Sequence, residues 1–174
     1  LLEAKPQRAG GGAERVIDER NAFIMTSIMR DVVRVGTAAR AMRLGRNDLA
    51  GKTGTTNDFV DAWFCGFNPS LVAVAWIGFD QPQTLGRNET GGAAALPIWM
   101  GYMGAVLKGA PEEPFTSPPG VVAIKVNPDT GLRTDGGSGV LDFFYQEFVP
   151  AEESAAPGWL GAPPPAEEVR NQLF

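Results

Sequence analysis

Apolar residues recur at helical spacing in the first third of the chain. Asp18 is of a type that caps helix N-termini, and we predict a helix over about Glu19–Val35 that ends at Gly36. Its expected buried face consists of Ala22, Met25, Met29, Val32 and Val33. A second, shorter helix is predicted over Thr37–Leu44, with Gly45 at its C-terminal end.

After residue 49 the pattern changes to that of β-strands. Three successive antiparallel strands are predicted, over residues 50–57, 60–67 and 71–79. Asn68-Pro69-Ser70 supplies turn-forming residues between the last two. Both of those strands are apolar on both faces, as expected of strands that helices cover on both sides.

A further helix is predicted to begin near Pro97, where the missing proline N–H costs little. It runs to about Lys108 and stops at Gly109. Together these elements predict an α/β fold in which an antiparallel sheet is flanked by helices.

The composition shifts after Gly109. Prolines between residues 111 and 119 indicate a linker, and Val121–Val126 with Gly131–Thr134 predict a small hairpin around Asn127-Pro128-Asp129-Thr130. From Pro150 the chain is rich in Ala, Pro and Glu, which predicts disorder. We therefore divide the chain into an irregular lead-in (1–17), a main α/β part (18–109), a linker with a small β extension (110–149) and a tail (150–174).

Charge and rare residues exclude several kinds of site. The chain has a net charge of −5, and residues 110–174 carry 3 basic against 10 acidic side chains, so no basic surface for nucleic acid is expected. There is no His, which excludes a Ser-His-Asp triad and His-ligated metals within this chain. The single Cys65 excludes an internal disulfide. No apolar run is long enough for a transmembrane helix, and we expect neither metal nor cofactor.

The segment that carries chemistry is Gly51-Lys52-Thr53-Gly54-Thr55. Lys52 supplies a positive charge that can hold neighbouring groups in reactive protonation states and attract an anionic substrate. Thr53 and Thr55 lie two apart, so their hydroxyls face the same side of a strand and suit a carboxylate. Gly54 removes a side chain and allows a substrate backbone to approach. The Thr55 N–H could then bind a developing oxyanion.

The short string Gly-Lys-Thr-Gly also fits structures without catalytic function. Gly-Lys-Thr-Gly alone is common and is typical of a turn or an edge strand. A phosphate-binding loop needs four residues between its first Gly and Gly-Lys-Thr, whereas Gly45 and Gly51 enclose five. The residues after Lys52 also have a strand pattern, and a phosphate loop would open a helix. The nucleotide-binding interpretation is therefore disfavoured.

The longer context resembles one family. Lys52–Asp58 reads Lys-Thr-Gly-Thr-Thr-Asn-Asp, and Asp61–Phe67 reads Asp-Ala-Trp-Phe-Cys-Gly-Phe. Further matching elements are Gly36-Thr37-Ala38, Trp76-Ile77-Gly78-Phe79-Asp80, Glu89-Thr90-Gly91-Gly92 and Pro97-Ile98-Trp99. In order and spacing, residues 14–109 resemble the C-terminal part of the transpeptidase domain of class A (bifunctional) penicillin-binding proteins, nearest to their 1a type.

The resemblance implies a peptidoglycan D,D-transpeptidase with a penicillin-binding/β-lactamase-like fold. In this family a serine attacks D-Ala-D-Ala, and β-lactams acylate the same serine. Lys52 matches the third-motif lysine, Thr53 and Thr55 match the carboxylate-binding residues, and the Thr55 N–H would supply half of the oxyanion hole. Such enzymes carry an N-terminal glycosyltransferase domain and face the bacterial periplasm, anchored to the inner membrane, here through a segment outside this chain.

The nucleophile of the family has no counterpart in this sequence. None of the five serines begins a Ser-x-x-Lys or Ser-x-Asn element. We therefore expect the chain to be the C-terminal portion of an enzyme whose N-terminal part carries both motifs, and to be inactive and poorly soluble alone. Two alternatives remain open: a β-lactamase-like serine hydrolase, and a non-catalytic module that binds peptide stems. Peptide stems and β-lactams are the expected ligands.

Overall fold

The computed structural model describes residues 16–153 of the chain. The predictions for residues 1–15 and 154–174 lie outside this range. The described residues form two compact units, one of residues 16–123 and 143–148 and one of residues 124–142 and 149–153. The four-part division drawn from composition stays a prediction.

Helix α1 begins where the capping residue predicts. It spans Glu19–Arg34, and the Asp18 carboxylate accepts a hydrogen bond from the Arg20 N–H at 2.9 Å. At the other end, a Cβ on Gly36 would lie 2.8 Å from the Val32 Cα, so only glycine fits this close approach. The predicted helix and its end are confirmed.

The predicted buried face of α1 was partly wrong. Val33 is buried as expected, but Met25 is 47% exposed and Phe23, which was not predicted, is buried. Phe23 packs edge-to-face on Phe143, with ring centroids 5.0 Å apart. Because that partner lies 120 residues away, helical spacing alone could not show which residue the helix would bury there.

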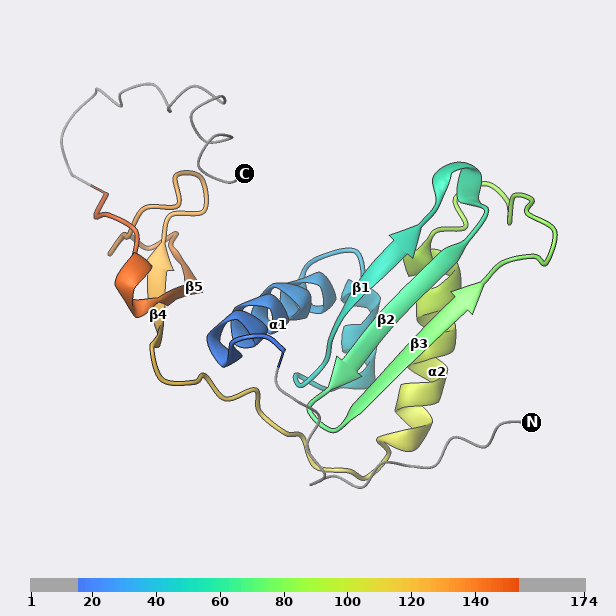
Figure 1. Cartoon of the computed structure of the whole chain (residues 1–174), viewed down its shortest axis with the longest axis horizontal. Helices are drawn as coiled ribbons and strands as arrows, with labels where there is room; N and C mark the ends of the chain where they lie inside the picture. Colours follow the sequence, from blue (N-terminus) through green and yellow to red (C-terminus); the bar gives the residue numbers. More distant parts are fainter. Residues whose placement is uncertain (1–15, 154–174) are drawn as a thin grey trace. The chain divides into compact units, whose positions relative to one another are not determined.

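Three antiparallel strands form the sheet of the first unit (Figure 1). They are β1 (Ala50–Thr55), β2 (Ala62–Asn68) and β3 (Leu71–Ile77), in the spatial order β1-β2-β3. The Asn68 side-chain oxygen accepts a hydrogen bond from the Leu71 N–H at 2.8 Å and closes the turn between β2 and β3. The strand order and the turn confirm the sequence-based prediction.

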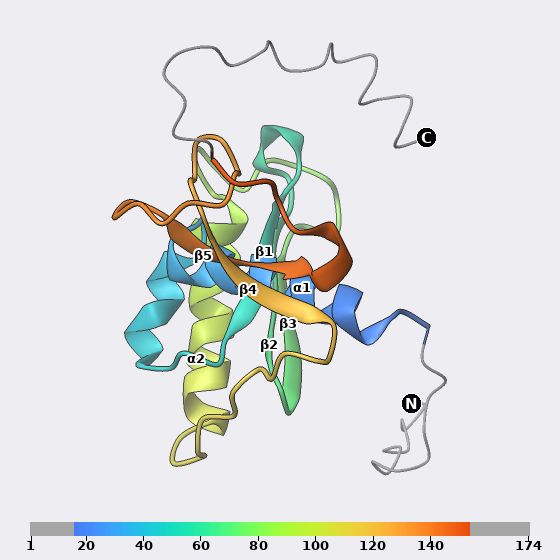
Figure 2. The ribbon, with the colours of Figure 1, turned by 90° about the vertical axis from the view of Figure 1, so that its left-hand side faces the viewer.

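The hydrophobic core lies between this sheet and α2 (Leu96–Val106). The rings of Trp99 and Phe64 meet edge-to-face at 4.9 Å, and the Trp99 indole N–H donates to the Gly66 carbonyl at 3.3 Å. A 3₁₀ helix over Ala39–Leu44 contacts α2. Figure 2 shows the sheet nearly edge-on, with α2 and the 3₁₀ helix on the same side.

The opposite face of the sheet is exposed within the described residues. Side chains of β2 and β3 alternate between buried and exposed positions, although both kinds are apolar. Trp63 (40% exposed), Val74 (56%) and Trp76 (46%) lie on the exposed face. Covering helices were predicted on both sides, and residues 16–153 supply them on one side only.

A buried ion pair fixes the chain segment that follows α2. The Arg46 guanidinium contacts the Asp48 carboxylate at 2.6 Å and also donates to the Ala110 and Pro111 carbonyls. Asp48 accepts a further hydrogen bond from the Glu113 N–H at 3.1 Å. Burial raises the pKa of Asp48, but the hydrogen bonds from Arg46 and Glu113 outweigh it and hold this pKa below its usual value.

The β extension differs from the predicted hairpin. Strand β4 (Val121–Val126) pairs with β5 (Val140–Tyr145). Residues 131–134 also pair with the end of β4, through the antiparallel bridge between Val126 and Arg133 and the hydrogen bond from the Thr134 N–H to the Lys125 carbonyl at 3.0 Å. The predicted turn does form, because the Gly131 N–H donates to the Asn127 carbonyl at 2.8 Å. The small hairpin around residues 127–130 therefore forms as a short pairing, whereas the longer pairing of β4 with β5 was not predicted.

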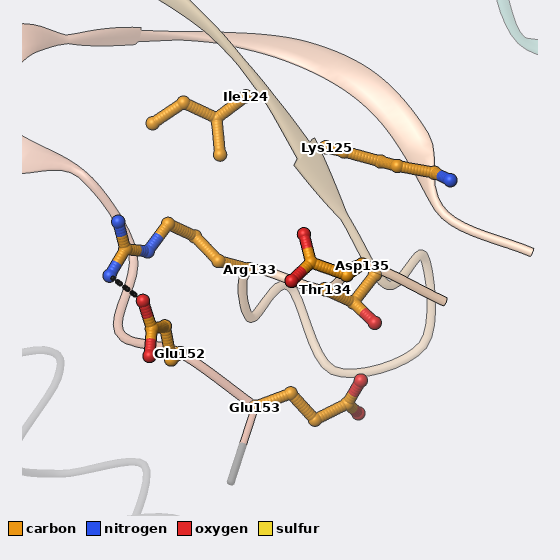
Figure 3. Close-up of a pocket in the computed structure, with 7 residues that line it drawn as sticks. All are labelled: Ile124, Lys125, Arg133, Thr134, Asp135, Glu152 and Glu153. Carbon is orange, nitrogen blue, oxygen red and sulfur yellow. Dashed lines mark hydrogen bonds and ion pairs between the residues drawn. The ribbon is translucent and has the colours of Figure 1, made fainter. Parts of the chain in front are cut away.

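The second unit includes the first residues of the predicted tail. The Arg133 N–H donates to the Ala151 carbonyl at 2.9 Å, and the Glu153 N–H donates to the Arg133 carbonyl at 2.8 Å. The Arg133 and Glu152 side chains form an ion pair at 2.9 Å (Figure 3). Residues 151–153 therefore have a defined place, although disorder was predicted from Pro150.

Candidate functional site

Strand β1 presents the residues of the Lys-Thr-Gly-Thr string on two different faces of the sheet. Thr53 and Thr55 pair with Phe64 and Ala62 and share the face that α2 covers. Lys52 pairs with Cys65 on the opposite, exposed face. The two hydroxyls thus lie on one side of the strand, as their spacing predicts, and the lysine lies on the other.

A cavity of about 480 Å³ opens in front of the two threonines. It is lined by Thr37, Thr53, Thr55, Thr90, Gly92 and Ala93. Thr37 precedes the 3₁₀ helix, and Thr90 caps a π-helical turn (Gly91–Ala95) that continues into α2. Three segments far apart in sequence therefore bring four hydroxyl groups to one small space.

All four of these hydroxyls form hydrogen bonds with neighbouring groups. The Thr37 and Thr53 oxygens lie 2.8 Å apart and share a hydrogen bond in which either is the donor. The Thr55 hydroxyl oxygen accepts a hydrogen bond from the Gly91 N–H at 3.0 Å. Cavities rich in fixed hydroxyl donors suit an anion such as a carboxylate.

Lys52 lies outside the cavity lining. Its ammonium group donates to the Thr53 carbonyl at 2.9 Å and so reaches the edge of the strand. Within residues 16–153, helix α1 contacts β1, and β2 is the only strand paired with β1, so this edge is open in the sense that no strand pairs with it. The lysine charge and the threonine hydroxyls flank the same open edge from opposite faces.

The Thr55 N–H points to this open edge as well. The next N–H, that of Thr56, donates to the Asp61 carbonyl at 3.1 Å on the β2 side. Successive N–H groups of an extended chain point to opposite edges. A group bound at the open edge could therefore accept a hydrogen bond from the Thr55 N–H while its anionic part lies near the hydroxyls.

Sequence reasoning named part of this site and missed the rest. Lys52, Thr53, Gly54 and Thr55 were identified by their spacing on one strand. Thr37, Thr90 and Gly92 were not, because they reach the cavity from other elements. The only signal for them was their presence in the Gly36-Thr37-Ala38 and Glu89-Thr90-Gly91-Gly92 strings, to which no role had been given.

A second cavity, of about 310 Å³, lies in the second unit (Figure 3). Its charged lining residues are Lys125, Arg133, Asp135, Glu152 and Glu153. Arg133 is already paired with Glu152, so the cavity offers no concentrated charge of one sign. Residues 16–153 contain no group of three or more side chains placed to hold a metal. They also contain no helix of the length and hydropathy that crossing a membrane requires.

Comparison with known proteins relates this chain to one group. No family model matches the chain. Penicillin-binding protein 1A of Pseudomonas aeruginosa is 48% identical over 90% of the chain, and that of Neisseria meningitidis serogroup B is 54% identical over 98%. The chain spans about a fifth of the length of these relatives (20% and 22%).

A solved structure agrees with the sequence relatives. A crystal structure of penicillin-binding protein 1A from Haemophilus influenzae superimposes with a TM-score of 0.75 at 34% identity. The match covers 80% of this chain and 22% of that one. The predicted class, an antiparallel sheet flanked by helices, is thus the fold of a solved protein of similar sequence.

Proposed function

We propose that this chain, which belongs to the penicillin-binding protein 1A family, supplies the Lys-Thr-Gly-Thr side of a peptidoglycan D,D-transpeptidase site. The observation that carries the proposal is the cavity in which Thr53 and Thr55 present two hydroxyls from one strand. Lys52 and the Thr55 N–H at the adjoining open edge complete the set of groups that a serine acyl transfer needs on this side.

Each residue has a distinct role in the proposed reaction. The terminal carboxylate of a peptide stem binds the Thr53 and Thr55 hydroxyls, which directs the preceding carbonyl to the open edge of β1. A serine outside this chain attacks that carbonyl, and the Thr55 N–H stabilises the oxyanion. D-Ala leaves, and the amine of a second stem then releases the acyl group from the serine. Lys52 favours the reactive protonation states of the neighbouring groups.

The remainder of the site belongs to the N-terminal part of the same enzyme. We infer that this part carries Ser-x-x-Lys and Ser-x-Asn and packs on the exposed face of the sheet. Trp63, Val74 and Trp76 leave that face apolar, and unpaired strand edges and apolar sheet faces are normally covered. The glycosyltransferase domain, the inner-membrane anchor and the periplasmic location also belong to this proposal.

Replacement of the two threonines tests the carboxylate-binding role. Thr53→Val and Thr55→Val in the complete enzyme should each slow acylation by penicillin about tenfold, because a hydrogen bond to a charged group contributes about 1.5–3 kcal/mol. The double variant should lose less than the sum of the two, since both hydroxyls bind one carboxylate. Acylation is measured with a fluorescent penicillin.

Thr116→Val is the matched control, because Thr116 is exposed in the linker and lies outside the cavity. It should react at the parent rate. Fully additive losses in the double variant, or no loss in either single variant, would show that the hydroxyls do not converge on one anion.

A further inference from the structure

The turn that opens α2 packs directly against the strand that carries the site. Gly91 is buried, and a Cβ on it would lie 2.5 Å from the Gly54 carbonyl oxygen, 3.0 Å from the Gly54 nitrogen and against the Trp63 carbonyl oxygen. A Cβ on Gly92 would lie 2.8 Å from the Thr37 carbonyl oxygen. Gly91 therefore lets this turn approach β1 more closely than any other residue would, and Gly92 does the same toward Thr37.

This close approach produces one polar contact with the site. The Gly91 N–H donates to the Thr55 hydroxyl oxygen at 3.0 Å, across 36 positions of sequence. The turn is itself held in place, since the Thr90 hydroxyl accepts a hydrogen bond from the Ala93 N–H at 3.2 Å. The donor is thus a fixed backbone group and not a mobile side chain.

The direction of this hydrogen bond decides what the Thr55 hydroxyl can do. A hydroxyl has one proton and two acceptor positions. Because the Gly91 N–H occupies an acceptor position, the hydroxyl proton is directed away from Gly91. The hydroxyl lines the cavity, so the proton can be donated to a ligand there. Accepting one hydrogen bond also strengthens the bond that the same hydroxyl donates.

We propose that Gly91 is a positioning residue, whose N–H fixes the Thr55 hydroxyl as a hydrogen-bond donor toward the carboxylate of the ligand. This inference rests on the proposed function, because it assumes that the cavity binds a carboxylate. Gly91 acts through Thr55 and touches no reacting atom. Its effect therefore depends on two features: the charge of the ligand carboxylate and the presence of the Thr55 hydroxyl.

The test compares two ligands in the complete enzyme. Gly91→Ala should slow acylation by benzylpenicillin about tenfold, the loss expected when one charge-assisted hydrogen bond is misdirected. Acylation by benzylpenicillin methyl ester, which has no carboxylate, should change by less than about twofold. In a Thr55→Val background, Gly91→Ala should add nothing further. Gly101→Ala is the matched control, because no atom lies within 4 Å of a Cβ at that position.

A second variant covers the case in which Gly91→Ala fails to fold. Exchange of Gly91 for glycolic acid by nonsense suppression replaces the N–H with an ester oxygen and adds no atom that could clash. The same ligand-dependent loss is expected. Equal losses for the two ligands, no loss for either, or additivity with Thr55→Val would overturn the proposal. A parent enzyme that forms no adduct with benzylpenicillin would instead refute the proposed function itself.

Discussion

Lys52→Ala in the complete enzyme should slow acylation by penicillin about a hundredfold, an effect comparable to the loss of one electrostatic group from a serine acyl-transfer site. The ammonium group is exposed and donates only to the neighbouring Thr53 carbonyl, at 2.9 Å. Its removal therefore takes a charge from the open edge of β1 and leaves the core intact. The melting temperature should fall by less than about 2 °C.

Lys108→Ala provides the matched control for this variant. Lys108 is exposed just beyond the end of α2, and it should react and melt like the parent. Acylation rates come from a fluorescent penicillin and melting temperatures from calorimetry on the same preparations. A normal acylation rate for Lys52→Ala would refute the proposed role of this lysine in acylation. A large fall in the melting temperature would show instead that Lys52 stabilises the fold.

Asp48→Asn should destabilise the first unit by about 3 kcal/mol at neutral pH, because it leaves the nearly buried charge of Arg46 without its partner. The Arg46 and Asp48 side chains are only 11% and 2% exposed. Asp31→Asn is the control, since its ion pair with Arg34 is more than half exposed and contributes little. Denaturant unfolding of both variants and the parent gives the comparison.

The difference in free energy of unfolding between the parent and Asp48→Asn should become smaller at low pH. The pKa of Asp48 in the folded chain lies below its unfolded value near 3.8. The stabilisation is therefore fully present above that unfolded value and is lost as the pH falls through the lower, folded pKa. Unfolding at pH 7, 5 and 3 should show a constant difference at the first two and a smaller one at the third. An unchanged difference at pH 3 would show that folding does not lower the pKa of Asp48 and would contradict this explanation.

Local signals explain why much of the main unit could be predicted from sequence. Asp18 caps α1, Asn68 closes the turn between β2 and β3, and alternating spacing placed the hydroxyls of Thr53 and Thr55 on one face. Each of these features depends on residues within a few positions of one another. Physical preferences of neighbouring residues were sufficient to determine them.

The features that were missed depend on distant partners. Residues 140–145 pair with β4 across an intervening segment that itself turns back on the end of β4, and local turn signals predict only the nearer pairing with Gly131–Thr134. Phe23 packs against Phe143, and the Thr55 hydroxyl accepts a hydrogen bond from the Gly91 N–H. Such contacts follow from how the elements pack in three dimensions, and no local pattern encodes them.

On the exposed sheet face, the sequence predicts burial that residues 16–153 do not provide. The sequence of β2 and β3 predicts burial on both faces, yet α2 covers only one within residues 16–153. The apolar pattern thus describes the environment of these strands in the proposed complete domain. We therefore expect Trp63 and Trp76, which are exposed here, to be buried against the N-terminal part of the enzyme.

The position of the penicillin adduct shows whether the nucleophilic serine lies outside this chain. The complete enzyme is labelled with a fluorescent penicillin, digested, and the modified peptide is identified by mass spectrometry. The serines of this chain are Ser27, Ser70, Ser117, Ser138 and Ser154. We predict a stoichiometric adduct on a serine of a Ser-x-x-Lys element outside residues 1–174, and none on these five. A stoichiometric adduct on any of the five would contradict the assignment of this chain to the Lys-Thr-Gly-Thr side of the site.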